Sequence, residues 1–419
     1  DTLKPVDGTT FTLTTGTDDL KGTDNADLFK AVNSSMLSEG TLQGADKIDG
    51  GAGNDTLRVD MKQNFDGFTT GSMKNVENVE LINSSNANLE FAASKIEGAT
   101  KYVVTDAVDK NTTISDLASL ASVEISGTAD TADTTLKVIY NAASTVATGS
   151  QTDVQNLKVT NQGSANTAAA DAATNAKFMT VDIDKVETLA ITTAGTANSL
   201  DLAASADVKT VTVAGEGQTE IKAVSATVTS FDASAATGNV IADLKAAATG
   251  ALTSVKTGAG NDKVTVSLDD LSSSATVAGG AGTDTLVVDA FTNTKQLNMS
   301  GIETVKLNTV TAIGGANAIF SGTNVTDLAN VEVKAGALAG NVQFVNMGAK
   351  DLTVTTLGAV TGNTLSADNS GAITVNMNKS ADTVTAAETS TTNLTFANAS
   401  SLTANVNEYQ TYSGTLTTG

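Results

Sequence analysis

The chain lacks several residue types that carry most protein chemistry. Its 419 residues include no cysteine, no histidine, no tryptophan and one proline, and Arg58 is the only arginine. Without cysteine it has no disulfide, no zinc–thiolate site and no thiol nucleophile. Without histidine, and with four tyrosines, the usual acid–base groups of an enzyme are scarce. These absences favour a protein that is not an enzyme.

The charge balance excludes two further classes of partner. The formal net charge is -22 and the isoelectric point is about 4.2. Nucleic acid and anionic membrane surfaces both require clusters of lysine and arginine, so neither is expected to bind. No run of about 18 apolar residues occurs, which speaks against membrane insertion. An excess of carboxylates is instead compatible with divalent cations.

A short apolar pattern recurs along the chain and predicts a repeat fold. The order apolar-x-x-apolar-x-apolar occurs in "VENVEL" (76–81), "VETLAI" (186–191), "VKTVTV" (208–213), "IETVKL" (302–307) and "LANVEV" (328–333). The central apolar positions follow each other at intervals of 20 to 26 residues, as from Leu189 to Val211. One short strand per 20 to 26 residues is typical of a solenoid. We therefore predict an all-β protein, a β-solenoid or parallel β-helix-like stack of coils of that length.

Other readings of the spacing remain open. An antiparallel sandwich also has evenly spaced strands, but this chain has few Asn-Gly or Asp-Gly turns. A leucine-rich-repeat solenoid has a similar period but requires an Asn-x-Leu step that is missing here. Two stretches, 127–150 and 163–177, are expected to be insertions or loops. Near the end, Leu352, Ile373 and Leu394 follow one another at 21-residue intervals and are expected to stack.

Glycine-rich turns are the most specific motif. Residues 47–60 read "KIDGGAGNDTLRVD", and "GGAG" is followed by a lone aspartate, Asp55, before a strand-like segment. "GGAGTDTLV" (279–287) repeats the pattern, and "TGAGNDKVT" (257–265) lacks only its first glycine. Weaker copies at 13–21, 22–30 and 41–49 follow a nine-residue phase. The pattern G-G-x-G-x-D-x-U-x is a calcium-binding β-solenoid repeat.

Stacking would give such turns enough ligands. Calcium takes six to eight oxygens, whereas one turn supplies about three, so two turns must share an ion. Asp262 and Asp284 lie 22 residues apart, which is one coil, so their turns should stack. The alternative is that these residues bind no metal, since aspartate and asparagine also form ordinary turns. For Asp18 and Asp27, in the weaker copies, this alternative is equally open.

Taken together, the turns resemble the repeats-in-toxin (RTX) calcium motif, and the chain resembles RTX-type bacterial surface-layer (S-layer) proteins. The motif-level likeness covers residues 13–58 and 257–287. The resemblance implies Ca²⁺ as cofactor, type I secretion through a one-step channel, calcium-triggered folding outside the cell and self-assembly into a surface lattice. Carried over by position, the calcium ligands are the aspartates Asp46, Asp55, Asp262 and Asp284 and the turn glycines Gly51, Gly53, Gly258, Gly260, Gly280 and Gly282.

The predicted organisation is two solenoid modules, 1–250 and 251–419, each with a calcium cluster near its start (13–58 and 257–287). "VENVEL" and "IETVKL" follow the two clusters and indicate a duplication. The predicted function is structural: an extracellular S-layer protein whose partner is itself, with a cell-surface polysaccharide or lipopolysaccharide as a possible anchor. The alternative is a calcium-stabilised adhesin or filament subunit, although no aromatic cluster suggests a ligand-binding tip.

Overall fold

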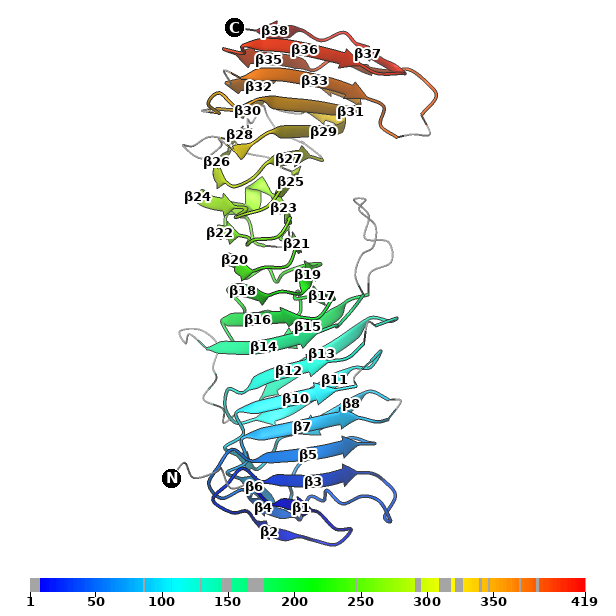
Figure 1. The fold of residues 1–419 in the computed structure, drawn as a ribbon, viewed down its shortest axis with the longest axis vertical. Coiled ribbons are helices and arrows are strands. Elements are labelled where there is room, and N and C mark those ends of the chain that lie inside the picture. The colour runs from blue at the N-terminus through cyan, green and yellow to red at the C-terminus, as the bar shows by residue number, and fades with distance from the viewer. Residues whose placement is uncertain are drawn as a thin grey trace, which may run out of the picture. The chain divides into compact units, whose positions relative to one another are not determined.

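The computed structural model describes residues 8–418 except 86, 107, 129, 143, 145, 147–152, 165–176, 246, 291–294, 309–317, 321–326, 339–340, 346, 363, 369–370 and 382–383. The chain divides into two compact units, Asp1–Ser225 and Ala226–Gly419. Both are β-solenoids built from parallel strands (Figure 1). The two modules predicted from the sequence, 1–250 and 251–419, were inferred from an internal duplication. Compact units do not show a duplication, so these two modules stay a prediction.

The first unit contains three parallel sheets. The longest joins β1 (Thr10–Thr12), β3 (Leu28–Asn33), β5 (Thr56–Met61), β7 (Asn78–Asn83), β10 (Lys101–Thr105), β12 (Ser122–Ser126), β14 (Val154–Thr160), β16 (Thr188–Ala194) and β18 (Thr210–Gly215). The second joins β8 (Leu89–Ala92), β11 (Thr112–Leu117), β13 (Thr134–Tyr140), β15 (Met179–Ile183), β17 (Ala197–Asp201) and β19 (Gln218–Ile221). The third, of β2 (Asp19–Lys21), β4 (Lys47–Asp49), β6 (Ser72–Lys74) and β9 (Ile96–Glu97), serves the first coils.

The second unit repeats the plan with two long sheets. One joins β20 (Ser230–Ala236), β22 (Leu252–Lys256), β24 (Leu271–Ala278), β26 (Lys295–Ser300), β28 (Ala318–Phe320), β30 (Val342–Phe344), β32 (Thr364–Asp368), β35 (Asn393–Ala397) and β38 (Leu416–Thr418). The other joins β21 (Val240–Asp243), β23 (Lys263–Ser267), β25 (Thr285–Ala290), β27 (Thr304–Leu307), β29 (Asn330–Leu338), β31 (Leu352–Gly362), β33 (Ala372–Asn378) and β36 (Ser401–Val406). β34 (Glu388–Ser390) pairs with β37 (Gln410–Tyr412). A short 3-10 turn, η1 (Leu268–Asp270), follows β23.

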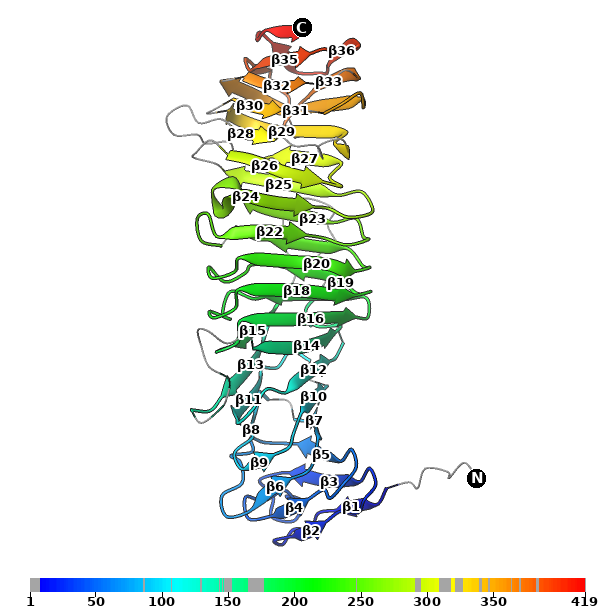
Figure 2. The same ribbon diagram turned by 90° about the vertical axis from the view of Figure 1, so that its left-hand side faces the viewer.

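The core consists of ladders of apolar side chains that run from coil to coil. Phe29, Leu57, Val79 and Tyr102 face one another in register on β3, β5, β7 and β10, and all four are buried. Because successive strand residues point to opposite faces, each strand alternates buried and partly exposed positions, as β5 does. Figure 2 shows the strands β14, β16 and β18 stacked one above the other, as their parallel pairing requires. The predicted solenoid is thereby confirmed.

Three local expectations were wrong or fall outside the described residues. Segment 127–150 was expected to be a loop, but it contains β13, whose buried alternate residues extend the ladder on β11. Leu394 does not stack on Ile373: Ile373 pairs with Leu402, and Leu394 lies in the other sheet opposite Leu365. The step from Ile373 to the residue that stacks on it, Leu402, is therefore 29 residues and not 21. Most of segment 163–177 (165–176) lies outside the described residues.

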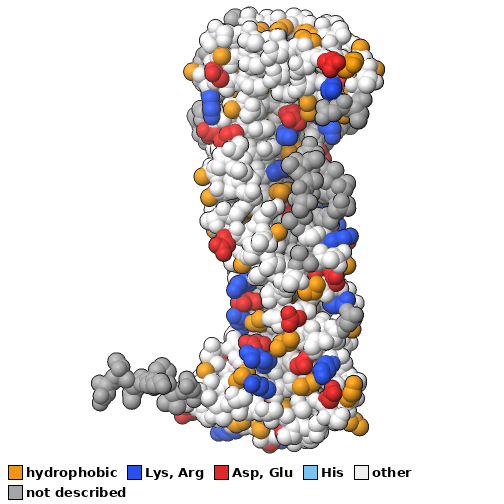
Figure 3. Space-filling view, turned by 45° about the vertical axis from the view of Figure 1, so that its right-hand side comes forward, with side chains coloured by type: hydrophobic (Ala, Val, Ile, Leu, Met, Phe, Trp, Pro, Cys, Tyr) orange, Lys and Arg blue, Asp and Glu red, His pale blue; other side chains and the backbone are white. Residues whose placement is uncertain are grey.

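The surface is polar and mixed in charge. On the face drawn in Figure 3, lysine or arginine side chains lie next to aspartate or glutamate, without a large area of one sign. Several such pairs bridge neighbouring coils, including Arg58–Glu80 at 2.6 Å and Lys101–Glu124 at 2.7 Å. In the described part of the chain, no helix is long and apolar enough to span a membrane.

The first coils place the predicted site residues at the corners. β1, β2 and β3 begin at residues 10, 19 and 28, and β4 and β5 at residues 47 and 56, so the nine-residue phase of the sequence becomes one strand and one turn. Asp18 and Asp46 precede β2 and β4, whereas Asp27 and Asp55 precede β3 and β5. The aspartates therefore form two columns at two corners of the solenoid.

Candidate metal centre

Two glycine turns, 50–55 and 279–284, have the same backbone conformation in the two units. The φ angles are 94° at Gly51 and 131° at Gly53, and 97° at Gly280 and 134° at Gly282. Glycine adopts such angles at little cost, unlike residues with a Cβ atom. A Cβ on Gly282 would also lie 2.0 Å from the carbonyl oxygen of Gly260. The glycines therefore permit both the turn and its direct stacking on the preceding coil.

The third predicted turn, 257–262, stacks in the same column with a different backbone. The N–H of Ala281 donates to the carbonyl of Gly258 at 2.8 Å, so coil-to-coil stacking of the two turns is confirmed. Gly258 and Gly260, however, lie outside the left-handed region of φ. This turn therefore shares its position in the column with the full motifs, but not their backbone conformation.

Carboxylates of successive coils form a hydrogen-bonded column in the first unit. The backbone N–H of Asp27 donates to Oδ1 of Asp55 at 2.7 Å, and the N–H of Asp55 donates to Oε2 of Glu77 at 2.8 Å. Asp27 and Asp55 are 2% and 1% exposed. Each carboxylate therefore caps the turn of the coil before it and is shielded from water.

The second unit contains an equivalent column. The N–H of Val240 donates to Oδ1 of Asp262 at 2.7 Å, and the N–H of Asp262 donates to Oδ1 of Asp284 at 2.8 Å. The N–H of Asp284 donates to Oε2 of Glu303 at 2.7 Å. Asp284 is 1% exposed. The same Asp–Asp–Glu arrangement thus occurs once in each unit.

The second carboxylate oxygen separates the full motifs from the partial ones. In partial turns it accepts the N–H of the residue four positions earlier: Thr23 to Asp27 at 2.5 Å, and Gly258 to Asp262 at 3.1 Å. In the full turns, Oδ2 of Asp55 and Oδ2 of Asp284 are buried without a hydrogen-bond partner. A buried carboxylate oxygen without a partner is costly, and a cation beside these two atoms would offset that cost.

The paired glycines explain why those oxygens are free. At Gly51 the left-handed φ turns the peptide, and its N–H lies 3.3 Å from Oδ1 of Asp49 instead of capping Asp55. The glycine before it leaves space for the carboxylate, since a Cβ on Gly50 would lie 2.6 Å from Oδ2 of Asp55. At Gly279 the same distance to Oδ2 of Asp284 is 2.7 Å. Gly22 in the partial turn 22–27 approaches Oδ2 of Asp27 equally closely, so the second glycine is what distinguishes the full motif there.

Electrostatics also favours a cation at the two full turns. Burial raises the pKa of Asp284 to about 6, and the nearby carboxylates of Asp262 and Glu303 add to the rise. Burial raises the pKa of Asp55 as well, with Asp27 and Glu77 contributing. The ionised forms are therefore destabilised in the metal-free fold, and a bound cation would offset this.

At Asp27 the net shift of the pKa has the opposite direction. Burial alone would raise its pKa, but hydrogen bonds from the Thr23 and Thr9 backbone N–H groups outweigh burial and lower it. Asp27 is therefore a stable ionised cap without a cation. This matches the plain turn-forming role that the sequence left open for it.

The residues present fit calcium better than magnesium. Among the described residues, no three acidic side chains converge on one point, so most ligands would have to be backbone carbonyls. Calcium accepts carbonyl-rich, irregular oxygen sets, whereas magnesium requires a tight octahedron and retains water. Asp55 and Asp284, with the carbonyls of their own glycine turns and of the stacked turns, are the residues that would hold it.

The other predicted aspartates are capped by the protein itself. Asp46 accepts the N–H of Asp18 at 2.9 Å and that of Gln43 at 2.7 Å. Asp18 accepts the N–H of Thr14 at 2.8 Å. Asp262 also has both oxygens bonded. Calcium binding at Asp18, Asp46 and Asp262 stays a prediction. Their carboxylates already accept hydrogen bonds, so they do not need a cation as a partner.

Two residues of the columns, Glu77 and Glu303, were not predicted as site residues. Each accepts the N–H of the motif aspartate one coil earlier. The signal was present in "VENVEL" and "IETVKL", where glutamate follows a buried Val76 or Ile302. Period-2 alternation places this glutamate on the exposed side of a strand, because the alternation does not distinguish a corner from a face.

The pH dependence of stability follows from these shifts. Because the folded-state pKa of Asp284 is raised from 3.8 to about 6, its contribution is complete below pH 4 and is lost as pH rises through 6. Calcium-free protein should thus be more stable at pH 5 than at pH 7.5, by about 1–2 kcal/mol for this group. Urea unfolding in chelator at both pH values measures the difference.

Calcium provides the control for this effect. It binds the ionised carboxylate, so the difference between pH 5 and pH 7.5 should shrink or reverse in millimolar calcium. The lowered pKa of Asp27 affects stability only at more acidic pH. Calcium-free protein that is more stable at pH 7.5 than at pH 5 would contradict the description of Asp284.

Comparison with known proteins gives no family assignment. No protein-family model matches the chain, and no curated protein matches it. The function therefore has to be argued from the fold and the site alone.

Proposed function

We propose that this chain is a structural protein of a bacterial cell-surface layer, which calcium stabilises and which associates with itself. The observation that carries the proposal is the pair of full glycine turns, each leaving one buried carboxylate oxygen, Oδ2 of Asp55 or of Asp284, without a partner. The RTX-type motif supports calcium as the ion. Extracellular calcium is millimolar, which suits sites of moderate affinity.

Bound calcium would supply positive charge and coordination between stacked turns. The protein's part is to hold Asp55 and Asp284 buried and to bring two coils close enough to share one ion. Because every coil of a solenoid contacts only its neighbours, rigid corners stabilise the adjacent strands. The proposed consequence is a solenoid that is loose where calcium is scarce and rigid outside the cell.

A structural role fits the rest of the molecule better than catalysis. The buried acidic groups at the corners cap backbone N–H groups, which is a structural role. Mixed charge on the surface is suited to contacts with further copies. A polysaccharide or lipopolysaccharide anchor, type I secretion and an extracellular location belong to the same proposal and rest on the resemblance.

Electron microscopy and light scattering of the purified chain test this proposal. We expect ordered assemblies in millimolar calcium that dissolve when excess chelator is added. Calcium-dependent stabilisation of a chain that stays monomeric at all concentrations would favour the adhesin alternative. An unchanged melting temperature and unchanged particle size in calcium and in chelator would contradict the proposal.

A further inference from the structure

A corner without paired glycines follows each full turn, one coil later. Corner 75–77 (Asn-Val-Glu) follows turn 50–55, and corner 301–303 (Gly-Ile-Glu) follows turn 279–284. The first residue of each corner is left-handed, with φ angles of 52° and 59°. The second residue is buried, and the third is the glutamate that accepts the N–H of the motif aspartate. The likeness of the two units therefore extends past the glycine turns.

The carbonyl of each left-handed corner residue lies close to the carboxylate oxygen that has no partner. A Cβ on Gly50 would lie 1.7 Å from the carbonyl oxygen of Asn75 and 2.6 Å from Oδ2 of Asp55. At the equivalent glycine of the second unit, Gly279, the two distances are 1.8 and 2.7 Å. In both units, an oxygen of the following coil and the aspartate oxygen therefore converge beside the first glycine of the motif.

The same convergence occurs in a partial turn, where a donor is present. A Cβ on Gly22 would lie 1.9 Å from the carbonyl oxygen of Gly50 and 2.7 Å from Oδ2 of Asp27. There the N–H of Thr23 donates to Oδ2 at 2.5 Å. In the full turns Oδ2 has no hydrogen-bond partner. The two converging oxygens of a full turn therefore need a positive partner that the partial turn supplies itself.

The corner glutamate adds a second negative charge beside the aspartate. Its Oε2 accepts the N–H of the motif aspartate, at 2.8 Å for Glu77 and 2.7 Å for Glu303, and Oε1 takes no part in this bond. Burial is the main cause of the raised pKa of Asp284, and the charges of Asp262 and Glu303 raise it further. Neighbouring carboxylates repel each other, and a divalent cation would balance the charges of one aspartate and one glutamate.

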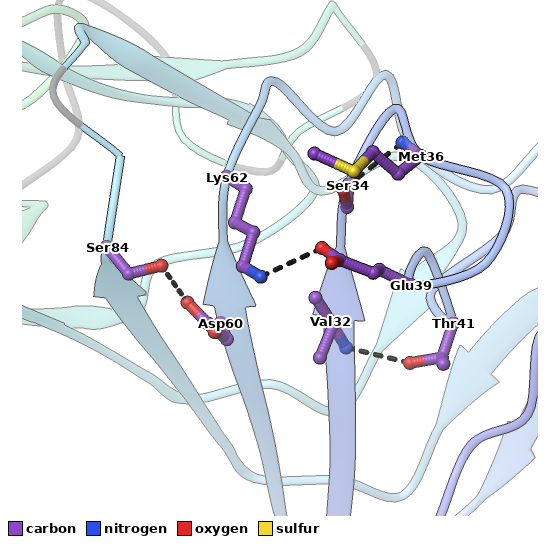
Figure 4. Close-up of polar contacts among 8 residues, drawn as sticks. All are labelled: Val32, Ser34, Met36, Glu39, Thr41, Asp60, Lys62 and Ser84. Carbon is purple, nitrogen blue, oxygen red and sulfur yellow. Dashed lines mark hydrogen bonds and ion pairs between the residues drawn. The ribbon is translucent and has the colours of Figure 1, made fainter.

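Elsewhere between coils, carboxylates have side-chain partners of the protein. Glu39 pairs with Lys62 at 3.0 Å, and the hydroxyl of Ser84 donates to Asp60 (Figure 4). At the corner, Oδ1 of Asp55 accepts a backbone N–H instead. A backbone N–H brings no net positive charge, so it leaves the charge at the corner unbalanced.

We propose that the corner glutamates, Glu77 and Glu303, are ligands of the calcium ions at the two full turns. Each ion lies between a full turn and the coil that follows it. Its ligands include Oδ2 of the aspartate, the carbonyl oxygen of the left-handed corner residue and a glutamate oxygen. The inference rests on the proposed calcium binding and names the coil that shares the ion. Calcium would thus connect a coil that has the glycine motif to one that lacks it.

A third corner, 185–187 (Lys-Val-Glu), provides a matched control. Lys185 is left-handed with a φ of 64°, Val186 is buried, and Oε2 of Glu187 accepts the N–H of Asp153 at 3.2 Å. The segment before Asp153 contains no paired glycines. Glu187 therefore caps a corner that faces no full turn, and it should not bind an ion.

Calorimetric titration of the full-length chain with calcium chloride tests the ligand role one site at a time. Asp284→Asn leaves the site at Asp55, and Glu77→Gln is then compared with Glu187→Gln in that background. Glutamine keeps an oxygen for the N–H but carries no charge. Because ligand charge tunes calcium affinity, we expect Glu77→Gln to weaken binding about tenfold or more. Glu187→Gln should leave the affinity unchanged.

The second unit gives an independent test of the same role. Glu303→Gln in an Asp55→Asn background should weaken calcium binding to the same extent, and it decides the question if Glu77→Gln does not fold. Unchanged affinities in the glutamine variants, while the wild type binds calcium, would overturn the ligand role and leave the proposed function standing. Weakened binding in these variants, without assembly of the wild type, would support the ligand role and contradict the surface-layer proposal. A wild type that binds no calcium would contradict both.

Hydrogen exchange of the wild type tests the position of the ion without any substitution. If the ion lies between turn 50–55 and corner 75–77, calcium should slow exchange most in β6 and β7, and less in β3 of the preceding coil. A larger effect in β3 than in β7 would place the ion on the other side of the turn and overturn the proposal.

Discussion

Asp284→Asn should lower the stability that calcium adds, while it raises the stability of the calcium-free protein at pH 7.5. The asparagine keeps an oxygen for the N–H of Asp262, which lies 2.8 Å from Oδ1, but carries no buried charge. A ligand present at 100 times its dissociation constant stabilises the folded state by about 2.7 kcal/mol. Loss of one such site should remove about that amount, measured by urea unfolding in calcium and in chelator.

Asp262→Asn is the matched control in the same column. Both oxygens of Asp262 accept backbone N–H groups, so an amide nitrogen must face a donor in either orientation. We expect a loss of about 1–3 kcal/mol with or without calcium, and a retained calcium increment. If Asp284→Asn and Asp262→Asn affected the calcium increment equally, the distinction between full and partial turns would be wrong.

Gly282→Ala should be among the most destabilising single substitutions in the second unit. Its φ of 134° is accessible almost only to glycine, and the added Cβ would lie 2.0 Å from the carbonyl oxygen of Gly260. Strain and clash together predict a loss of about 3 kcal/mol or more. Because coils contact only their neighbours, hydrogen exchange should show the loss first in β23 and β25.

Gly250→Ala is a milder reference substitution, because Gly250 has neither the clash nor the φ angle that is nearly restricted to glycine. Gly250 also has a left-handed φ, 72°, but no atom lies within 4 Å of its Cβ position. Its substitution should cost only about 1–2 kcal/mol and leave the calcium response intact. Equal losses for the two variants would mean that turn 279–284 does not stack closely on the preceding coil.

The fold could be predicted largely from the sequence, because each coil of a solenoid repeats a short pattern of apolar residues. The apolar pattern around Leu189 and Val211 places one strand per coil, and these residues do face each other. The prediction failed where coil length changes. Leu394 keeps the 21-residue spacing but moves to the other sheet, because the spacing does not say how many strands a coil contains.

The sequence by itself determined the positions of the turns and the chemistry available to them. Paired glycines before a single aspartate recur at 50–55 and 279–284, and only glycine can take the φ angles found there. The lack of histidine and cysteine restricts the side-chain ligands of these turns to oxygen. These properties belong to single residues and short segments, so they are readable without coordinates.

Only the tertiary structure decided which carboxylates are left without a partner. Asp27, Asp55, Asp262 and Asp284 each end a glycine-containing turn, but both oxygens of Asp27 and Asp262 accept N–H groups, whereas Oδ2 of Asp55 and of Asp284 has no partner. Glu77 and Glu303 enter the columns from a neighbouring coil. Burial, stacking and hydrogen bonding between coils are long-range properties, and they arise only when residues about 20 to 30 positions apart come together.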